Sequence, residues 1–147
     1  MRPKRTGRYR VLIGVGGNVG DVARRFRKLY RYLDQARWLK PEATAPLYHN
    51  PPFGYLDQPP FLNTLLLGRT SLSSSALLRR LLWTEKRFGR QRSFKNAPRT
   101  LDLDIIFFET KVVYNEKLRI PHPEWRARAS VLVPLVALEA YRRRMKR

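Results

Sequence analysis

Two aspartates, Asp102 and Asp104, stand one residue apart in the most apolar strand that the sequence predicts, residues 101–108. Successive side chains of a strand point to opposite faces of the sheet, so both carboxylates would lie on one face, roughly 7 Å apart. Carboxylates that face one spot repel each other unless a cation lies near them. Because Mg²⁺ takes one or two carboxylates together with phosphate oxygens and waters, the pair is typical of a magnesium site for a phosphate-bearing substrate.

An ordinary amphipathic strand with its polar face in water would show the same spacing, and for an isolated pair that explanation would be the better one. Here cations cluster within fifteen residues before the pair, among them Arg90, Arg92, Lys95 and Arg99. In phosphoryl transfer, metal ions bridge the phosphates while arginines stabilise the charge that develops on the transferred group. The neighbourhood of the pair therefore favours phosphoryl transfer.

The chain carries 31 Lys and Arg against 11 Asp and Glu, a formal net charge of +20. Clustered cations could bind a nucleic acid through its phosphates, or they could draw a small polyanion such as a nucleotide into a positive cleft. A solvated basic surface without a specific partner is the third explanation. The basic ends, residues 1–8 and 142–147, are expected to be mobile, solvated charge.

Other features of the composition limit the class of protein. The chain has no Cys, which excludes a disulfide scaffold and any Cys-based metal or redox site. It has no run of about 18 apolar residues and no signal-peptide pattern, so the sequence predicts a cytoplasmic protein without a membrane span. Its 147 residues fit one domain that buries its own core, and we expect residues 1–147 to form that domain.

Strands and helices alternate along the chain. Apolar and β-branched runs predict strands at residues 9–15, 43–48, 61–69 and 101–108. Helices are expected after Asp21 and after Ser73 to Ser75, which can cap them. A small hairpin at residues 112–120 and a last helix within residues 126–140, which could begin only after Pro134, complete the chain. This β-α-β-β-α-β order predicts an α+β fold, a ferredoxin-like sandwich in which helices pack on one face of an antiparallel sheet.

Two further patterns bear on the site. The glycines between residues 14 and 20 lack the Gly-Lys-Ser/Thr of a phosphate-binding loop and do not fit the dinucleotide spacing, so they predict a turn and a helix cap. Asn63 lies among leucines, on the same strand face as Phe61. A buried amide needs a hydrogen-bond partner, and we favour a ligand over a structural hydrogen bond.

The residues around the aspartate pair, NAPRTLDLDII at 96–106, resemble the signature of the 6-hydroxymethyl-7,8-dihydropterin pyrophosphokinase family. Four further blocks resemble the family in the family's order: residues 13–21, 47–63, 88–92 and 120–135. No block is decisive alone, but a chance match of five ordered blocks is improbable. Together they cover most of residues 11–138.

The resemblance implies a Mg²⁺-dependent diphosphotransferase, a pyrophosphokinase of folate biosynthesis. Such an enzyme transfers pyrophosphate from ATP to 6-hydroxymethyl-7,8-dihydropterin, giving the pterin diphosphate and AMP. ATP and a reduced pterin would be the partners of a monomeric protein. A membrane is not expected as a partner, and neither is a nucleic acid, although the charge leaves the latter open.

Carried over by position, the resemblance implies roles for individual residues. Asp102 and Asp104 would be the metal ligands and hold two Mg²⁺ ions. The catalytic set would be Arg90, Arg92, Arg99, Asp102 and Asp104. The ATP-binding set would be Arg92, Arg99, Ile105, Leu118, Arg119, His122 and Arg128. The pterin-binding set would be Asn50, Pro51, Phe53, Phe61 and Asn63, with Phe61 stacked on the ring.

The sequence departs from the family at Ser130, where the second aromatic wall of the pterin site would fall. Ser cannot stack, so either Trp125 takes that place or the pocket is open on that side. Two alternative functions therefore stay under consideration: a ferredoxin-like RNA-binding module and a catalytically weakened interaction protein. An RNA-binding sheet would carry basic and aromatic residues on its fourth strand rather than two aspartates.

Overall fold

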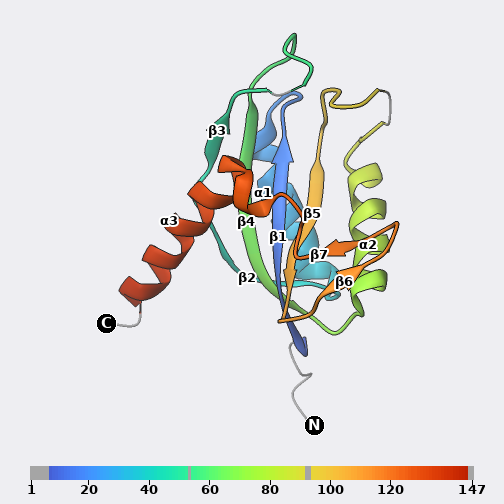
Figure 1. Ribbon diagram of the computed structural model, residues 1–147, viewed down its shortest axis with the longest axis vertical. Coiled ribbons are helices and arrows are strands. Elements are labelled where there is room, and N and C mark those ends of the chain that lie inside the picture. Colours follow the sequence, from blue (N-terminus) through green and yellow to red (C-terminus); the bar gives the residue numbers. More distant parts are fainter. Residues whose placement is uncertain (1–6, 53, 92–93, 146–147) are drawn as a thin grey trace.

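A five-stranded antiparallel sheet forms the centre of the computed structural model, which describes residues 7–52, 54–91 and 94–145 (Figure 1). Its strands are β1 (Tyr9–Gly17), β2 (Lys40–Thr44), β3 (Tyr48–Asn50), β4 (Phe61–Thr70) and β5 (Asp102–Phe108). They lie in the order β2-β4-β1-β5, and β3 pairs with the other end of β4. This order, with a helix after β1 and another after β4, confirms the ferredoxin-like α+β class.

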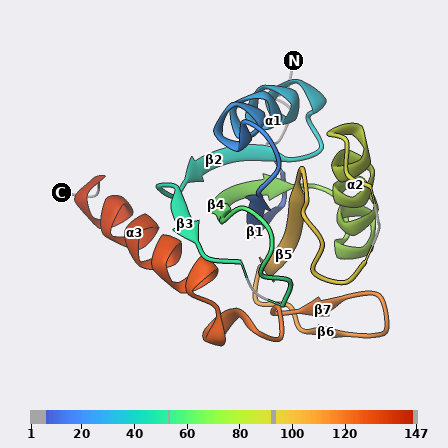
Figure 2. The same ribbon diagram turned by 90° about the horizontal axis from the view of Figure 1, so that it is seen from above.

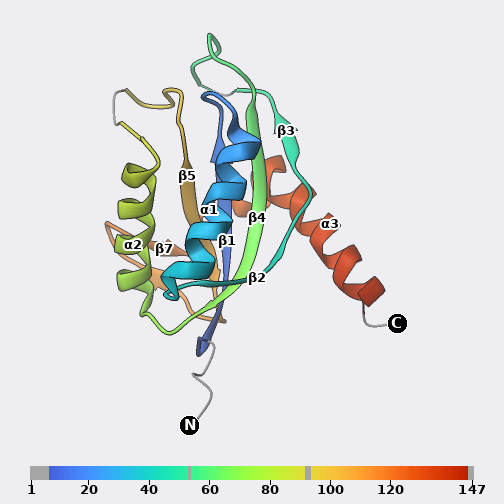
Figure 3. The ribbon, with the colours of Figure 1, turned by 180° about the vertical axis from the view of Figure 1, so that it is seen from behind.

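Two helices, α1 (Val22–Ala36) and α2 (Ser74–Arg87), cover one face of the sheet, as Figure 3 shows. Both begin at the predicted caps, where the Asp21 carboxylate and the Ser73 hydroxyl each accept a backbone N–H three residues on. Their apolar stripes pack against the sheet and form the larger core. This core includes Val11, Ile13, Phe26, Leu29, Leu77, Leu81, Leu101 and Leu103.

A third helix, α3 (Ala129–Met145), covers the opposite face (Figure 2), so the expectation that the helices share one face is wrong for α3. Alternate side chains of a strand serve the two faces, and the apolar ones on this second face also need cover. The helix begins at Ala129 rather than after Pro134. Pro134 is the sixth residue of α3, and its missing N–H removes the one helical hydrogen bond that it would donate to Ser130. The smaller core here comprises Leu12, Ala45, Leu65, Ile106, Val131 and Leu138.

The single strand predicted at residues 43–48 is wrong, because two strands, β2 and β3, replace it. Pro46 lies between them and has no N–H to donate to a ladder. Both strands pair with β4, β2 along its second half and β3 along its first half. This segment thus lies at the edge of the sheet.

The predicted hairpin is present as β6 (Val113–Tyr114) and β7 (Arg119–Ile120). The side-chain Oδ1 of Asn115 accepts the backbone N–H groups of Lys117 and Leu118, each at 2.9 Å. The N–H of His122 then donates to the carbonyl of Ile106 at 3.0 Å. This bond fastens the chain after the hairpin to β5.

The two basic ends are only partly described. Helix α3 continues through Met145 and so includes part of the end predicted at 142–147. Residues 1–6 and 146–147 lie outside the described residues. Among the helices described, none has the length and hydropathy needed to cross a membrane.

Candidate active site

A polar cleft of about 290 Å³ lies on the α3 side of the sheet. Strands β1, β4 and β5 contribute to it, together with the loop before β5 and the start of α3. Most of the residues predicted for catalysis and pterin binding meet here. The polar and charged residues that line it are Asn50, Asn63, Thr64, Arg90, Asn96, Arg99, Asp102, Asp104, His122, Arg128 and Ser130.

The strand register explains how the two halves of the cleft come together. Gly16 of β1 pairs with Asn63 of β4 on one side and with Asp102 of β5 on the other. Gly14 pairs with Asp104 in the same way. Residues paired in register point to the same face, so the aspartates and Asn63 share one face with two glycines between them. The prediction that Asp102 and Asp104 lie on one face is confirmed, since both line the cleft.

The glycines on β1 keep the floor of the cleft open. A Cβ atom at Gly16 would lie only 2.6 Å from Nδ2 of Asn63, and one at Gly14 would lie 3.2 Å from Cδ1 of Ile106. The prediction that these glycines form a turn is therefore wrong for Gly14 and Gly16, which are strand residues. Gly17 is the last residue of β1, and among the glycines between residues 14 and 20 only Gly20, just before α1, has a positive φ, 71°. The alternation of glycines within an apolar strand was the signal in the sequence for this floor.

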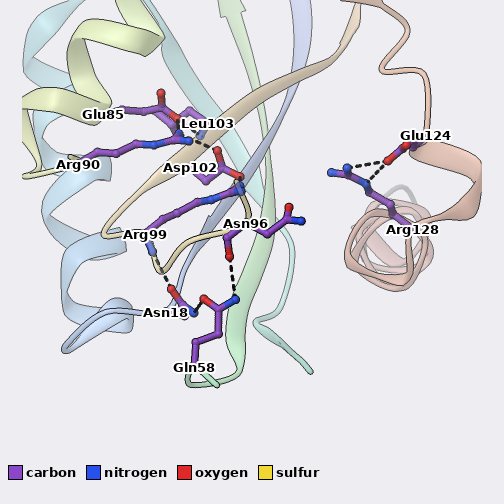
Figure 4. A network of polar contacts seen from close by, with 10 residues as sticks. All are labelled: Asn18, Gln58, Glu85, Arg90, Asn96, Arg99, Asp102, Leu103, Glu124 and Arg128. Atoms are coloured by element: carbon purple, nitrogen blue, oxygen red, sulfur yellow. Dashed lines mark hydrogen bonds and ion pairs between the residues drawn. The ribbon is translucent and has the colours of Figure 1, made fainter. Parts of the chain in front are cut away.

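Two arginines hold Asp102 (Figure 4). Arg90 donates to Oδ1 and Arg99 to Oδ2 of the carboxylate, each at 2.9 Å. The structure thus brings together three of the residues predicted for catalysis. Arg92, the remaining arginine of the predicted catalytic set, lies outside the described residues.

Glu85 of α2 completes this network and was not predicted. Its carboxylate accepts the N–H of Leu103 at 2.8 Å and forms an ion pair with Arg90. The residue is 4% exposed, and burial raises its pKa to about 7. The Leu103 N–H and the Arg90 guanidinium act in the opposite direction and lower the pKa. Glu85 therefore fixes the Arg90 guanidinium beside β5. Glu85 is the one acidic residue of a strongly basic helix, which was the signal for it in the sequence.

Burial also raises the pKa of Asp104, to about 7, and repulsion from Asp102 and Glu85 adds to the rise. Arg128 and Arg99 act in the opposite direction. A cation close to Asp104 would favour its ionised form. The two carboxylates offer the hard oxygen ligands that Mg²⁺ prefers, so they fit this ion.

Protein side chains alone do not complete a metal site there. The described residues contain no group of three or more His, Cys, Asp or Glu placed to hold a metal. Phosphate oxygens and waters would have to supply the remaining ligands. Such a shared site is usual for Mg²⁺ bound with a nucleotide.

The predicted pterin residues divide into three groups. Asn50, Phe61 and Asn63 line the cleft. Pro51 is exposed and is not one of the described lining residues, and Phe53 lies outside the described residues. The buried Oδ1 of Asn63 has no hydrogen-bond partner among the described residues. An unpaired buried acceptor costs about 1–3 kcal/mol, and an N–H of a ligand would relieve that cost.

The remaining ATP residues surround a second cavity, also of about 290 Å³. Ile105, Leu118 and Arg119 line it, while Asp104 and His122 line both this cavity and the cleft. Burial and the nearby Arg128 lower the pKa of His122, so its imidazole is neutral at pH 7. Arg99 and Arg128 belong to the cleft alone. The predicted nucleotide set thus spans two adjoining cavities.

Ser130 lines the cleft at the start of α3. Trp125 does not replace an aromatic wall there: its ring packs edge-on against Phe107, with ring centroids 5.1 Å apart. Phe61 is the one aromatic side chain among the described residues that line the cleft. Of the two explanations for Ser130, the structure favours a pocket with one aromatic wall.

Asn18 joins the loops around the cleft and was also not predicted (Figure 4). Its backbone N–H donates to the carbonyl of Arg99, and its side-chain oxygen accepts the Arg99 N–H, at 2.9 and 2.8 Å. Its amide donates to Gln58, whose own amide donates to the carbonyl of Asn96, each at 2.9 Å. This chain of bonds connects the loop before β4 with the loop before β5 and holds the backbone of Arg99.

Known proteins resemble the chain over most of its length. Residues 12–140 match the family model described as 7,8-dihydro-6-hydroxymethylpterin-pyrophosphokinase (HPPK). The chain is 41% identical over 128 residues to 2-amino-4-hydroxy-6-hydroxymethyldihydropteridine pyrophosphokinase of Helicobacter pylori, covering 86% of this chain and 78% of that protein. The enzyme of the same name from Campylobacter jejuni is 40% identical over 131 residues, 89% of this chain and 83% of the relative.

A longer relative contains a similar segment. The mitochondrial folate synthesis bifunctional protein of Arabidopsis thaliana is 35% identical over 130 residues, which are 88% of this chain and 23% of the plant protein. The match to the family model covers most of β1, the whole of the other strands of the sheet, the residues that line both cavities and the start of α3.

Proposed function

The chain belongs to the 7,8-dihydro-6-hydroxymethylpterin-pyrophosphokinase family, and we propose that the cleft between β4, β5 and α3 is its active site. The enzyme transfers pyrophosphate from ATP to 6-hydroxymethyl-7,8-dihydropterin in folate biosynthesis. In this reaction the pterin hydroxyl oxygen bonds to the β-phosphorus, and the bond from that phosphorus to the bridging oxygen of AMP breaks. The hydroxyl proton is lost, and AMP leaves with the bridging oxygen.

The unpaired Asn63 oxygen carries the assignment of the acceptor half of the site. It is buried and lines the same cleft as the aspartate pair. A flat heterocycle with ring N–H groups would satisfy this oxygen and stack on Phe61. The glycine floor leaves the space between Asn63 and Asp102 open, so an acceptor held at Asn63 can reach phosphates held at β5.

The arginines carry the assignment of the donor half. Arg90 and Arg99 present two guanidiniums at Asp102, and Arg128 lines the opposite side of the cleft. A triphosphate would compete with Asp102 for these donors, since guanidinium groups bind phosphate in two-point contacts. The protein would then contribute by position and by charge stabilisation, with little covalent work.

We further propose that the activity depends on Mg²⁺, held by Asp102 and Asp104 together with the ATP phosphates. When bound, the ions would neutralise phosphate charge. The raised pKa of Asp104 supports this proposal, because its ionised form is disfavoured without a neighbouring cation. Isosteric replacement of one carboxylate should therefore abolish turnover while the fold stays intact.

The nucleotide base would occupy the second cavity. Leu118 and Ile105 provide its apolar walls, and Arg119 stands at its edge with its guanidinium 4.8 Å from the centre of the Tyr114 ring. His122 and Asp104 separate this cavity from the cleft. A nucleotide could thus lie across both, with its phosphates toward Asp104. A monomeric state and a cytoplasmic location stay predictions.

The alternative functions are weaker. The face of β5 that an RNA-binding sheet would use carries Asp102 and Asp104. A catalytically weakened interaction protein would not need the network of Glu85, Arg90 and Arg99, whose buried charges are costly to keep. Ser130 is the one feature that favours this second alternative.

The experiment is AMP formation from Mg·ATP, with and without 6-hydroxymethyl-7,8-dihydropterin. The wild type should release AMP only with the pterin, and Asp104→Asn should not release it. Asp34→Asn, which changes an exposed carboxylate on α1, is the matched control and should stay active. Wild-type protein that binds ATP but releases no pterin-dependent AMP would contradict the proposal. It would favour the alternative of a catalytically weakened interaction protein.

A further inference from the structure

The face of the molecule opposite the cleft carries an aromatic pair between α1 and α2, the two helices in front in Figure 3; Trp83 is exposed and Tyr32 is half-buried. Trp83 of α2 is 48% exposed, and its ring centre lies 6.3 Å from that of Tyr32 on α1. The guanidinium carbon of Arg87 lies 5.5 Å from the centre of the Trp83 ring and 5.3 Å from that of Tyr32. An exposed indole beside a guanidinium is a ready stacking surface.

Cations surround this aromatic pair. On a helix, the surface neighbours of a residue lie three and four positions away on either side. For Trp83 all four of these neighbours are exposed cations: Arg79, Arg80, Lys86 and Arg87. Helix α1 adds the exposed cation Lys28, four positions before Tyr32, and further exposed cations at Arg24 and Arg31. We call this set, with Tyr32 and Trp83, the Trp83 surface.

Acidic residues do not balance the Trp83 surface. The one acidic residue of α2, Glu85, is buried and turned toward the sheet, where it bonds to Leu103. On α1 the exposed Asp34 is the one acid beyond the N-terminal cap. Within the described residues, the ion pairs involve none of the cations of this surface.

Lys86 and Arg87 lie in the last turn of α2, where cations favour the helix dipole, but the cations of α1 do not stabilise their own helix. Arg24 with Lys28 and Arg27 with Arg31 are like-charge pairs four residues apart, which destabilise a helix. A cost of this kind without an internal benefit is typical of a surface that meets an external polyanion.

We propose that the Trp83 surface binds single-stranded nucleic acid. Unpaired bases would stack on Trp83, and the surrounding arginines and lysines would contact the phosphates, the combination used by proteins that bind single strands. A lipid surface fits less well, because Trp83 is the one large apolar side chain that α1 and α2 expose. A duplex would use the cations but leave the indole without a partner. RNA and DNA share the chemistry that this surface recognises.

The Trp83 surface lies on the other side of the sheet from the cleft, so binding there does not require the active site. Its function would be separate from pyrophosphate transfer. Trp83→Ala should therefore leave pterin-dependent AMP formation at the wild-type rate. That activity also reports that the variant is folded.

Binding is measured by fluorescence anisotropy with labelled single strands of uridine or thymidine nucleotides, roughly 20 long, over a range of salt concentrations. Trp83→Ala should weaken binding about 5- to 150-fold, and Trp83→Phe should restore most of the loss. The slope of log affinity against log salt concentration is negative, and Arg87→Ala should make it less steep by about 0.7. Lys111→Ala is the matched control, since it removes an exposed cation that also lies over an aromatic ring, Phe108, away from this surface.

Preference for the uridine strand would identify RNA as the partner, and preference for thymidine would identify DNA; either supports the proposal. Equal affinity of Trp83→Ala and wild type would overturn it, because binding would then be unspecific attraction to net charge. Tighter binding to anionic phosphatidylserine vesicles than to either strand, lost with Trp83→Ala, would overturn it in favour of a membrane.

Discussion

Replacing Asp104 by Asn should stabilise the protein at neutral and alkaline pH when divalent cations and nucleotide are absent. Burial raises the pKa of Asp104 from 3.8 to about 7, and repulsion from Asp102 and Glu85 contributes. The ionised carboxylate is disfavoured in the folded state, whereas an amide of the same shape has no charge to bury. The replacement should therefore raise the free energy of unfolding, although it removes an active-site carboxylate.

The magnitude follows from the difference in pKa between the folded and unfolded states. Below the unfolded value of 3.8, Asp104 is neutral in both states and costs nothing. Between that value and the folded value of about 7, the unfolded chain is the more ionised, so stability falls by about 1.4 kcal/mol per pH unit. Above about pH 7 the full cost is present, on the order of 4 kcal/mol, and the variant escapes it.

Urea unfolding in EDTA, followed by tryptophan fluorescence, tests this at several pH values. Wild type and Asp104→Asn should have similar midpoints near pH 4 and diverge as the pH rises, with the variant more stable. Mg·ATP should reduce the difference in urea midpoint between the two proteins, because it stabilises the folded wild type more than a variant that lacks a metal ligand. A variant less stable than wild type at pH 8, or a difference that is constant with pH, would refute the reasoning from burial.

Three further substitutions test the geometry of the cleft. Gly16→Ala should raise the KM for the pterin about 5- to 100-fold, because the new Cβ would lie 2.6 Å from the Asn63 amide. Steady-state kinetics measures this KM, and the KM for ATP should stay unchanged. Ser130→Phe should lower the pterin KM about 2- to 10-fold by adding a second aromatic wall; an unchanged or higher KM would show that this side of the cleft does not face the ring. Glu85→Gln should reduce kcat while the KM for the pterin stays near its wild-type value, because Glu85 holds Arg90 beside Asp102 and has no contact with the cleft's acceptor half. A lower kcat together with a higher pterin KM would argue for general unfolding, which circular dichroism would reveal.

The local features of the fold were within reach of the sequence. Strand alternation, helical spacing and cap residues depend on neighbours a few positions apart, so the strands around Asp102, the caps at Asp21 and Ser73, and the hairpin at Asn115 could be predicted. The errors lie where the outcome depends on distant partners. Pro46 divides a strand whose pairing β4 decides, and Pro134 is accommodated in a helix that the second face of the sheet requires as a cover.

By itself the sequence determined that Asp102 and Asp104 share a face, that arginines precede them, and that Asn63 would need a partner if buried. Each of these follows from the period of a strand and the chemistry of one side chain. Only the tertiary structure decided that Gly16 lies between Asn63 and Asp102, and that Glu85, from a helix on the other face, anchors Arg90. The physical reason is that such contacts join segments far apart in the chain, and their geometry exists only once the sheet has assembled.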